Sequence, residues 1–224
     1  MIGSANPLHF RLWAMLLIYL ILRFVGGSLG QLVLYPVTLL VTFLHEFGHA
    51  LGAIITGGEV VSLQVSPDGS GYTTTRGGSS GLILMGGYVG SAVLGNLLFR
   101  IGVKYKRFTQ TTLLLLAGIM ALVGVVWFES IISTAILFGF ALVLYAIVRK
   151  TNWEQDVLMF LGLATVLYIL QDFRVGPGGD LQQYERVVGL FPSQVWMYIW
   201  LVLVLLITLV NLRALFFRPR AQLS

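Results

Sequence analysis

Seven apolar runs in this sequence are close to the length that a helix needs to cross a lipid bilayer. Hydrophobic residues make up 57% of the 224 residues and charged residues only 10%, whereas soluble domains carry about 25% charged residues. Backbone groups in lipid must be hydrogen-bonded within the chain, so such runs are expected to form helices. We therefore expect an all-α polytopic membrane protein with about six to seven transmembrane helices, forming one domain over residues 1–224. The expected spans are Leu12–Val25, Leu32–Ile55, Ser80–Phe99, Thr109–Phe128, Ile131–Val148, Val157–Gln171 and Val195–Leu212.

The net charge is +5, and most of the basic residues fall in three groups that follow the third, fifth and seventh runs. With seven spans, three basic groups lie on the same side of the membrane, and the positive-inside rule makes that side cytoplasmic. The basic residues form no broad stripe, so we expect the lipid bilayer and no nucleic acid as a partner. The three groups are Arg100 with Lys104, Lys106 and Arg107, then Arg149-Lys150, then Arg213 with Arg218 and Arg220.

A polar, glycine-rich segment at residues 57–79 interrupts the spans. Val61, Leu63 and Val65 alternate with polar residues, and the turn Ser66-Pro67-Asp68-Gly69 follows them. Tyr72-Thr73-Thr74-Thr75 then supplies a returning β-prone strand. The pattern predicts a small β-hairpin that rests on the helices with one edge unpaired.

The pentad His45-Glu46-Phe47-Gly48-His49 lies inside the expected span Leu32–Ile55. Each ionisable group near the bilayer centre costs on the order of 2.5–3.5 kcal/mol, so such residues are functional candidates. The i, i+4 spacing places both imidazoles on one helical face, where they can share one metal ion. Glu46 lies about 100° around the helix and could act as general base on a metal-bound water. A polar patch that holds helices together is the alternative, but a metal ion also explains Glu46.

A catalytic zinc site uses three protein ligands, so two histidines leave one ligand to be found. The chain has no cysteine, and its remaining histidine, His9, precedes the first span and is expected to be a solvated interfacial residue. The third ligand should therefore be a carboxylate. Asp180 is the first choice because it follows a Gly-Pro-Gly-Gly turn and opens a polar helix, although an N-cap role would also suit it. Asp172, at the end of the sixth span, is the alternative third ligand or a second residue that orients a histidine.

Other polar residues are expected to play structural roles. Asp68 favours local hydrogen bonds in its turn, and Glu154 and Asp156 read as a solvated loop beside Arg149-Lys150. Trp196, Trp200 and Tyr198 are expected to be interfacial anchors. Gly87, Ser91 and Gly95 recur at helical spacing, which predicts close packing against the helix that carries the histidines.

These residues resemble the site-2 protease family of zinc intramembrane metallopeptidases, and most closely its compact members without a PDZ domain. The resemblance rests on His45-Glu46-Phe47-Gly48-His49-Ala50 in a span, the glycine-rich hairpin that follows, and a later aspartate near a Pro/Gly turn. It covers residues 40–100 and 172–200. It implies one Zn²⁺ bound by His45, His49 and a late aspartate, with Glu46 as the catalytic glutamate. It also implies an edge strand that pairs with an unwound substrate. We expect an integral, multi-pass membrane protein, in the plasma membrane of a prokaryote.

The sequence thus predicts a zinc-dependent endopeptidase that hydrolyses peptide bonds of membrane-embedded or membrane-adjacent substrates. A membrane protein or peptide could bind by strand addition to the hairpin at residues 59–76. A non-catalytic metal-binding scaffold is the alternative, and a transporter is a third possibility because carboxylates and histidines in spans can relay ions.

Overall fold

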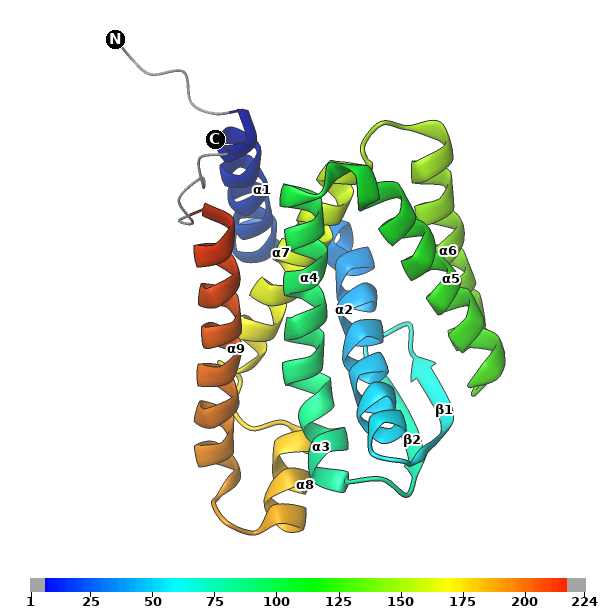
Figure 1. Cartoon of the computed structure of the whole chain (residues 1–224), viewed down its shortest axis with the longest axis vertical. Coiled ribbons are helices and arrows are strands. Elements are labelled where there is room, and N and C mark those ends of the chain that lie inside the picture. Colours follow the sequence, from blue (N-terminus) through cyan, green and yellow to red (C-terminus); the bar gives the residue numbers. More distant parts are fainter. Residues whose placement is uncertain (1–6, 217–224) are drawn as a thin grey trace, which may run out of the picture.

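The computed structural model describes residues 7–216, and within them six helices are long and apolar enough to cross a membrane (Figure 1). They confirm the predicted all-α polytopic class. The six are α2 (Gly27–Ile55), the continuous helix Ser80–Lys104, η2 (Lys106–Phe108) with α5 (Thr109–Val126), α6 (Ile131–Lys150), α7 (Glu154–Asp172) and α9 (Ser193–Phe216). The helix Ser80–Lys104 consists of α3 (Ser80–Met85), the π-helical η1 (Gly86–Gly90) and α4 (Ser91–Lys104).

The remaining elements are two shorter helices and a hairpin. They are α1 (Pro7–Phe24), α8 (Gly179–Val188), β1 (Glu59–Val65) and β2 (Gly71–Arg76). The first predicted span corresponds to α1, an 18-residue helix that carries Arg11 and Arg23 and is not one of the six candidate spans. Six candidate spans among the described residues agree with the predicted range of six to seven.

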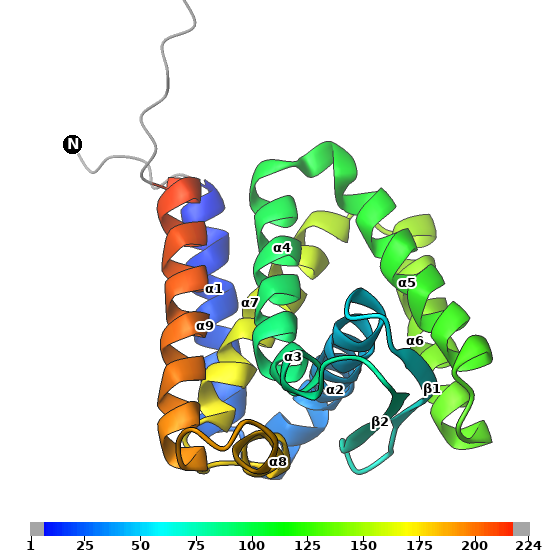
Figure 2. The same ribbon diagram turned by 60° about the horizontal axis from the view of Figure 1, so that its bottom comes forward.

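Helix α2 lies between two groups of buried side chains and so forms the centre of the fold (Figure 2). Leu40 and Phe43, both fully buried, pack towards α5, α6 and the hairpin. Val37 and Val41 pack on the other side, towards α1, α7 and α9. Because both sides of α2 are covered, the polar residues near its C-terminal end are held in a fixed environment.

Glycines allow α2 and η1 to touch through their backbones. A Cβ atom on Gly48 would lie 2.1 Å from the carbonyl oxygen of Gly86, and one on Gly86 would lie 2.4 Å from that of Gly48. Small residues permit this approach between membrane helices. The predicted small-residue ladder is thus confirmed at Gly87, which faces α2, but Gly95 faces Thr165 of α7 instead.

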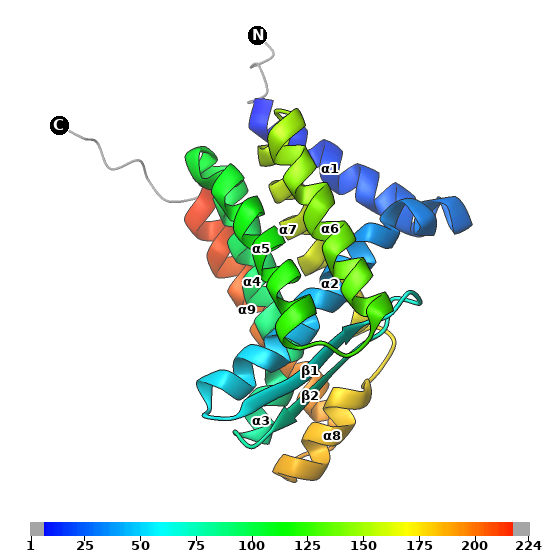
Figure 3. The same cartoon turned by 90° about the vertical axis from the view of Figure 1, so that its right-hand side faces the viewer.

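The hairpin forms where the alternating pattern predicts it, with Leu63 paired to Thr73 and Val65 paired to Gly71. The outer edge of β1 is occupied, because Leu63 donates its N–H to the carbonyl oxygen of Trp127 (3.0 Å) and Val65 donates to Ser133 Oγ (2.9 Å). Among the described residues, no backbone hydrogen bond occupies the outer edge of β2. This free edge faces α8 (Figure 3).

Basic loops and the hairpin lie at opposite ends of the molecule. The connections from α4 to α5 and from α6 to α7, and the C-terminal end of α9, lie at the upper end in Figure 1, whereas the hairpin and α8 lie at the lower end. The described residues of the three basic groups therefore lie at the same end of the molecule, as the sequence predicted. Arg218 and Arg220 lie outside the described residues.

Two predictions outside the site are wrong. Trp200 is only 1% exposed and packs against Tyr88 and Tyr184, because η1 and α8 cover this part of α9. Glu154 is buried and accepts a hydrogen bond from Gln110 Nε2 (2.7 Å), and Asp156 pairs with Arg11. Both acids belong to the first turn of α7 rather than to a loop, and acidic side chains stabilise a helix N-terminus.

Candidate metal centre

His45, His49 and Asp180 come together at one point beside the C-terminal half of α2. Nε2 of His45 lies 2.8 Å from Asp180 Oδ2, and Nε2 of His49 lies 3.2 Å from the same oxygen. One ligand atom from each residue lies within 4.8 Å of the others. The two histidines share a face because they are one helical turn apart, as the sequence predicted.

The short helix α8 brings Asp180 to the histidines. Gly178 is the N-cap residue, with an extended conformation and no side-chain cap, and Asp180 is the second residue of the helix. The N-cap alternative for Asp180 is therefore wrong, because its carboxylate contacts the imidazoles instead. Leu181, which is fully buried, anchors the helix in the packing around α9.

The surroundings of Asp180 keep its carboxylate ionised. Burial raises the pKa of Asp180, but hydrogen bonds to His45 and His49 outweigh burial and hold the pKa well below its ordinary value. An ionised carboxylate is the form that ligates a metal ion.

His49 is oriented by a hydrogen bond from its other ring nitrogen. Nδ1 lies 2.7 Å from the carbonyl oxygen of Ile83 and can only donate to it. In the neutral ring, Nε2 then carries the lone pair that a metal ion requires. Metal-ligating histidines are commonly fixed in this way through their second nitrogen.

Gly87 leaves the room that the two imidazoles occupy. A Cβ atom at Gly87 would lie 2.5 Å from Cε1 of His49 and 2.6 Å from Nε2 of His45. Two imidazoles and one carboxylate are a donor set that suits Zn²⁺. Such an ion also fits the geometry, because the two Nε2 atoms converge, the ring of His49 is fixed by Ile83, and Gly87 leaves space beside both rings.

Glu46 lies next to this cluster without being part of it. Its side chain is buried and points towards the hairpin, where Thr73 Oγ1 lies 2.7 Å from Glu46 Oε2. Gly71 provides the space for it, since a Cβ atom there would lie 2.6 Å from both Cγ and Oε1 of Glu46. An acid so placed beside a candidate metal site is available for proton transfer.

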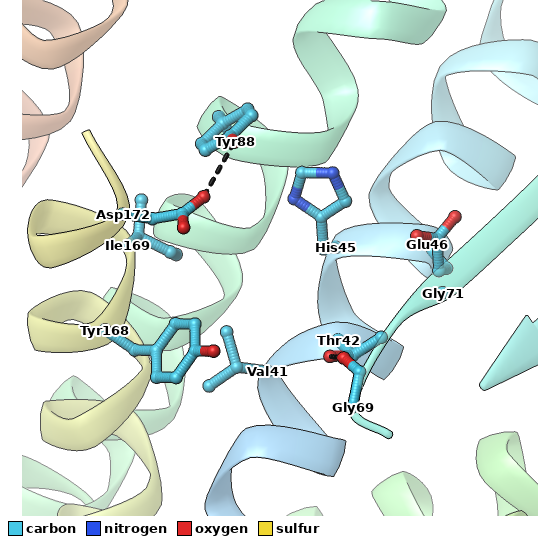
Figure 4. Close-up of a pocket in the computed structure, with 10 residues that line it drawn as sticks. All are labelled: Val41, Thr42, His45, Glu46, Gly69, Gly71, Tyr88, Tyr168, Ile169 and Asp172. Carbon is cyan, nitrogen blue, oxygen red and sulfur yellow. Dashed lines mark hydrogen bonds between the residues drawn. The ribbon is translucent and has the colours of Figure 1, made fainter. Parts of the chain in front are cut away.

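Asp172 lies outside the ligand group. It accepts a hydrogen bond of 2.7 Å from the Tyr88 hydroxyl, and the Tyr88 ring stands edge-on to His45 with ring centroids 4.8 Å apart (Figure 4). Among the described residues, Asp172 contacts Tyr88 and neither histidine, because η1 inserts this ring beside His45, so the structure gives no support to Asp172 as the alternative third ligand or as the residue that orients a histidine.

The remaining candidates are far from the cluster or bound locally. Asp68 accepts hydrogen bonds from the N–H and Oγ of Ser70, which lower the pKa of its carboxyl, as its place in a turn predicted. His9 is exposed in α1, where its ring contacts Phe216. Neither residue contributes to the candidate metal centre.

Two cavities meet at Glu46. The first, of about 230 Å³, lies between α2, α7 and the hairpin turn and is lined by His45, Glu46, Tyr88, Tyr168 and Asp172 among others (Figure 4). The second, of about 430 Å³, follows the free edge of β2 towards α8. Its lining includes Glu46, His49, Gly71, Thr73, Thr75 and Asp180. The cluster is thus accessible from two sides.

Sequence reasoning did not assign Gly71, Thr73, Gly87 or Tyr88 to the site. Gly71 and Thr73 were recognised only as parts of the hairpin, and Gly87 only as a packing residue. The run Gly86-Gly87-Tyr88 inside an apolar span was the available signal, because adjacent glycines weaken a helix without a packing reason.

The fold and site define a multi-pass membrane protein with a His-His-Asp group that could hold a metal ion. The family model described as Peptidase M50B-like matches residues 12–211, and the chain belongs to this family. Its membership of a membrane peptidase family confirms the resemblance to site-2 proteases. No curated protein and no solved structure matches the chain significantly.

Proposed function

We propose that the protein is a zinc-dependent intramembrane endopeptidase. The observation that carries the proposal is the convergence of His45, His49 and Asp180 on one point, with Glu46 buried beside it. His45, His49 and Asp180 would hold one Zn²⁺. Bound there, zinc supplies Lewis acidity, which activates water and polarises a carbonyl group.

Glu46 would perform the proton transfers of peptide hydrolysis. As a carboxylate it accepts a proton from the attacking water, and it later delivers that proton to the amine that leaves. The buried position of Glu46 limits competing hydrogen bonds with bulk water. Its place between the two cavities gives it access to water from one side and to a polypeptide from the other.

The substrate would be a membrane-embedded or membrane-adjacent polypeptide that binds as an extended strand. A transmembrane helix hides its carbonyl groups in hydrogen bonds, so the cleaved segment must unwind first. Strand addition to an exposed edge is a common way to hold such a segment. Only β2 offers such an edge in the hairpin, because the outer edge of β1 is bonded to Trp127 and Ser133.

The positive-inside rule would place the basic end of the molecule in the cytoplasm, and the hairpin and α8 towards the opposite face of the membrane. We propose the plasma membrane of a prokaryote as the location, on the strength of the resemblance to compact site-2 proteases.

A non-catalytic metal-binding scaffold is the second candidate function. It is favoured by the fact that His45, His49 and Asp180 alone would hold a metal between α2 and α8 and so join these helices. It does not explain why a carboxylate is buried beside the cluster and hydrogen-bonded to the hairpin.

Zinc content and cleavage of a single-span peptide in proteoliposomes, compared between wild type and Glu46→Gln, test the proposal. We expect one zinc ion per chain in both, and cleavage only by wild type. Equal cleavage by both proteins would reject Glu46 as the catalytic residue. Zinc binding without cleavage of any membrane peptide would favour the scaffold.

A further inference from the structure

The free edge of β2 and the carboxylate of Glu46 meet at a single residue, Thr73. In an antiparallel pair, residues alternate between those whose N–H and C=O groups point to the partner strand and those whose groups point away. Leu63 donates its N–H away from β2, to the carbonyl oxygen of Trp127. Leu63 and Thr73 therefore form a pair whose N–H and C=O groups point away from the partner strand. The N–H and C=O of Thr73 therefore point to the free edge, where the second cavity lies.

The side chain of Thr73 points in a different direction, towards α2. Its Oγ1 lies 2.7 Å from Glu46 Oε2 and 3.1 Å from the backbone carbonyl oxygen of Glu46. Both acceptors belong to the same residue. A hydroxyl has only one proton to donate, and a hydrogen bond to an ionised carboxylate is stronger than one to a neutral carbonyl.

Among the described residues, neither Thr74 nor Thr75 has a hydrogen bond to Glu46, whereas Thr73 does. Thr74 lies on the opposite face of the strand, where its Oγ1 accepts a hydrogen bond from Ser62 (3.2 Å). Gly71, two residues before Thr73 on the same face, can contribute only space beside Glu46. Thr73 is thus the β2 side chain that donates to the carboxylate.

We infer that Thr73 is a positioning residue that fixes Glu46 relative to the strand on which the substrate is laid. This inference rests on the proposed function, since it takes Glu46 as the catalytic residue and β2 as the substrate edge. The backbone of Thr73 binds the extended segment and its hydroxyl holds the carboxylate. One residue therefore sets the distance between the bound peptide bond and the group that transfers its protons.

The test compares Thr73→Val, which keeps the branched shape but loses the hydroxyl, with Thr73→Ser, which keeps the hydroxyl. Thr112→Val is the matched control, because Thr112 is half-buried on α5 and its hydroxyl donates to the carbonyl oxygen of Phe108 (2.8 Å), one turn earlier. Zinc-loaded full-length protein in proteoliposomes is assayed for kcat and KM on a single-span peptide. Infrared difference spectra against Glu46→Gln isolate the carboxylate band of Glu46 in each background.

We expect Thr73→Val to lower kcat by about 10- to 100-fold, the effect of losing one hydrogen bond to a charged group. KM should change little, because the backbone of residue 73 still binds the peptide. The Glu46 band should shift in Thr73→Val and not in Thr73→Ser, and Thr73→Ser should recover most of kcat. Zinc content should be equal in all variants, and Thr112→Val should match wild type.

A Thr73→Ser variant as impaired as Thr73→Val would overturn the inference, as would a Thr73→Val variant with wild-type kcat. In either case, cleavage by wild type and its loss in Glu46→Gln would leave the proposed function intact. If wild type binds zinc but does not cleave, the proposed function fails. An unchanged Glu46 band in Thr73→Val would then overturn the hydrogen-bonding role of Thr73 by itself.

Discussion

Gly71 lies so close to Glu46 that a Cβ atom on the glycine would stand 2.6 Å from Cγ of the glutamate. The same atom would stand 2.6 Å from Cγ2 of Thr42, so the space beside Gly71 is closed on two sides. Carbon atoms at optimal separation lie about 3.5–4.0 Å apart, and the backbone of α2 cannot retreat because its other side is packed. The hairpin therefore requires glycine here for the buried glutamate to keep its position.

Gly71→Ala is expected to displace Glu46 and to reduce kcat by at least about 100-fold, because a catalytic group moved by about 1 Å can lose that much rate. Zinc content should stay at the wild-type level, since Gly71 does not contact the three candidate ligands. Kinetics and metal analysis on the same preparation check both statements. Gly118→Ala on α5, where an added Cβ meets nothing within 4 Å, is the control. Normal turnover in Gly71→Ala would show that Glu46 can act from another position.

Gly87→Ala is expected to weaken zinc binding, because the added methyl group would overlap the rings of both His45 and His49. Disturbing the residues that orient metal ligands typically costs about 10- to 100-fold in affinity. Competition with a chelator of known affinity measures the change. Gly139→Ala on α6, with open space at its Cβ position, should bind zinc like wild type. Equal zinc affinity in the two variants would contradict a metal site beside Gly87.

Asp180→Asn and Asp172→Asn are expected to differ in metal binding. Asp180 contacts both imidazoles, so its amide variant should lose most of the bound zinc. Asp172 accepts from Tyr88 and reaches no histidine, so its variant should keep the zinc ion. Metal analysis after dialysis separates the two cases. Zinc lost from Asp172→Asn but kept by Asp180→Asn would reverse the assignment of the third ligand.

The absence of cysteine from the chain allows the substrate edge to be located by disulfide trapping. In the Glu46→Gln background, Tyr72→Cys on β2 should cross-link to a cysteine placed near the cleavage site of a bound peptide. Val61→Cys on β1 should not, although Val61 is also exposed (47%, against 63% for Tyr72). Gel mobility under oxidising conditions reports the adduct. Cross-linking through β1 alone would place the substrate on the wrong edge for our proposal.

The sequence by itself determined the class of the protein and the local parts of the site. Apolar runs of bilayer length predict membrane helices because unpaired backbone groups are too costly in lipid. The spacing of His45 and His49 predicts a shared face because the helical period is fixed, and alternation around Leu63 and Val65 predicts a strand in the same way. These properties depend only on residues close together in the chain.

Tertiary structure alone decided which carboxylate completes the cluster and which hairpin edge is free. Asp180 and His45 are 135 residues apart, and only the packing of α8 against α3 and α9 brings them together while η1 places Tyr88 in front of Asp172. Trp127 at the end of α5 and Ser133 in the first turn of α6 likewise occupy the edge of β1 and leave that of β2 open. Sequence periodicity fixes which side of an element a residue occupies, whereas the partner opposite that side depends on long-range packing that no local pattern encodes.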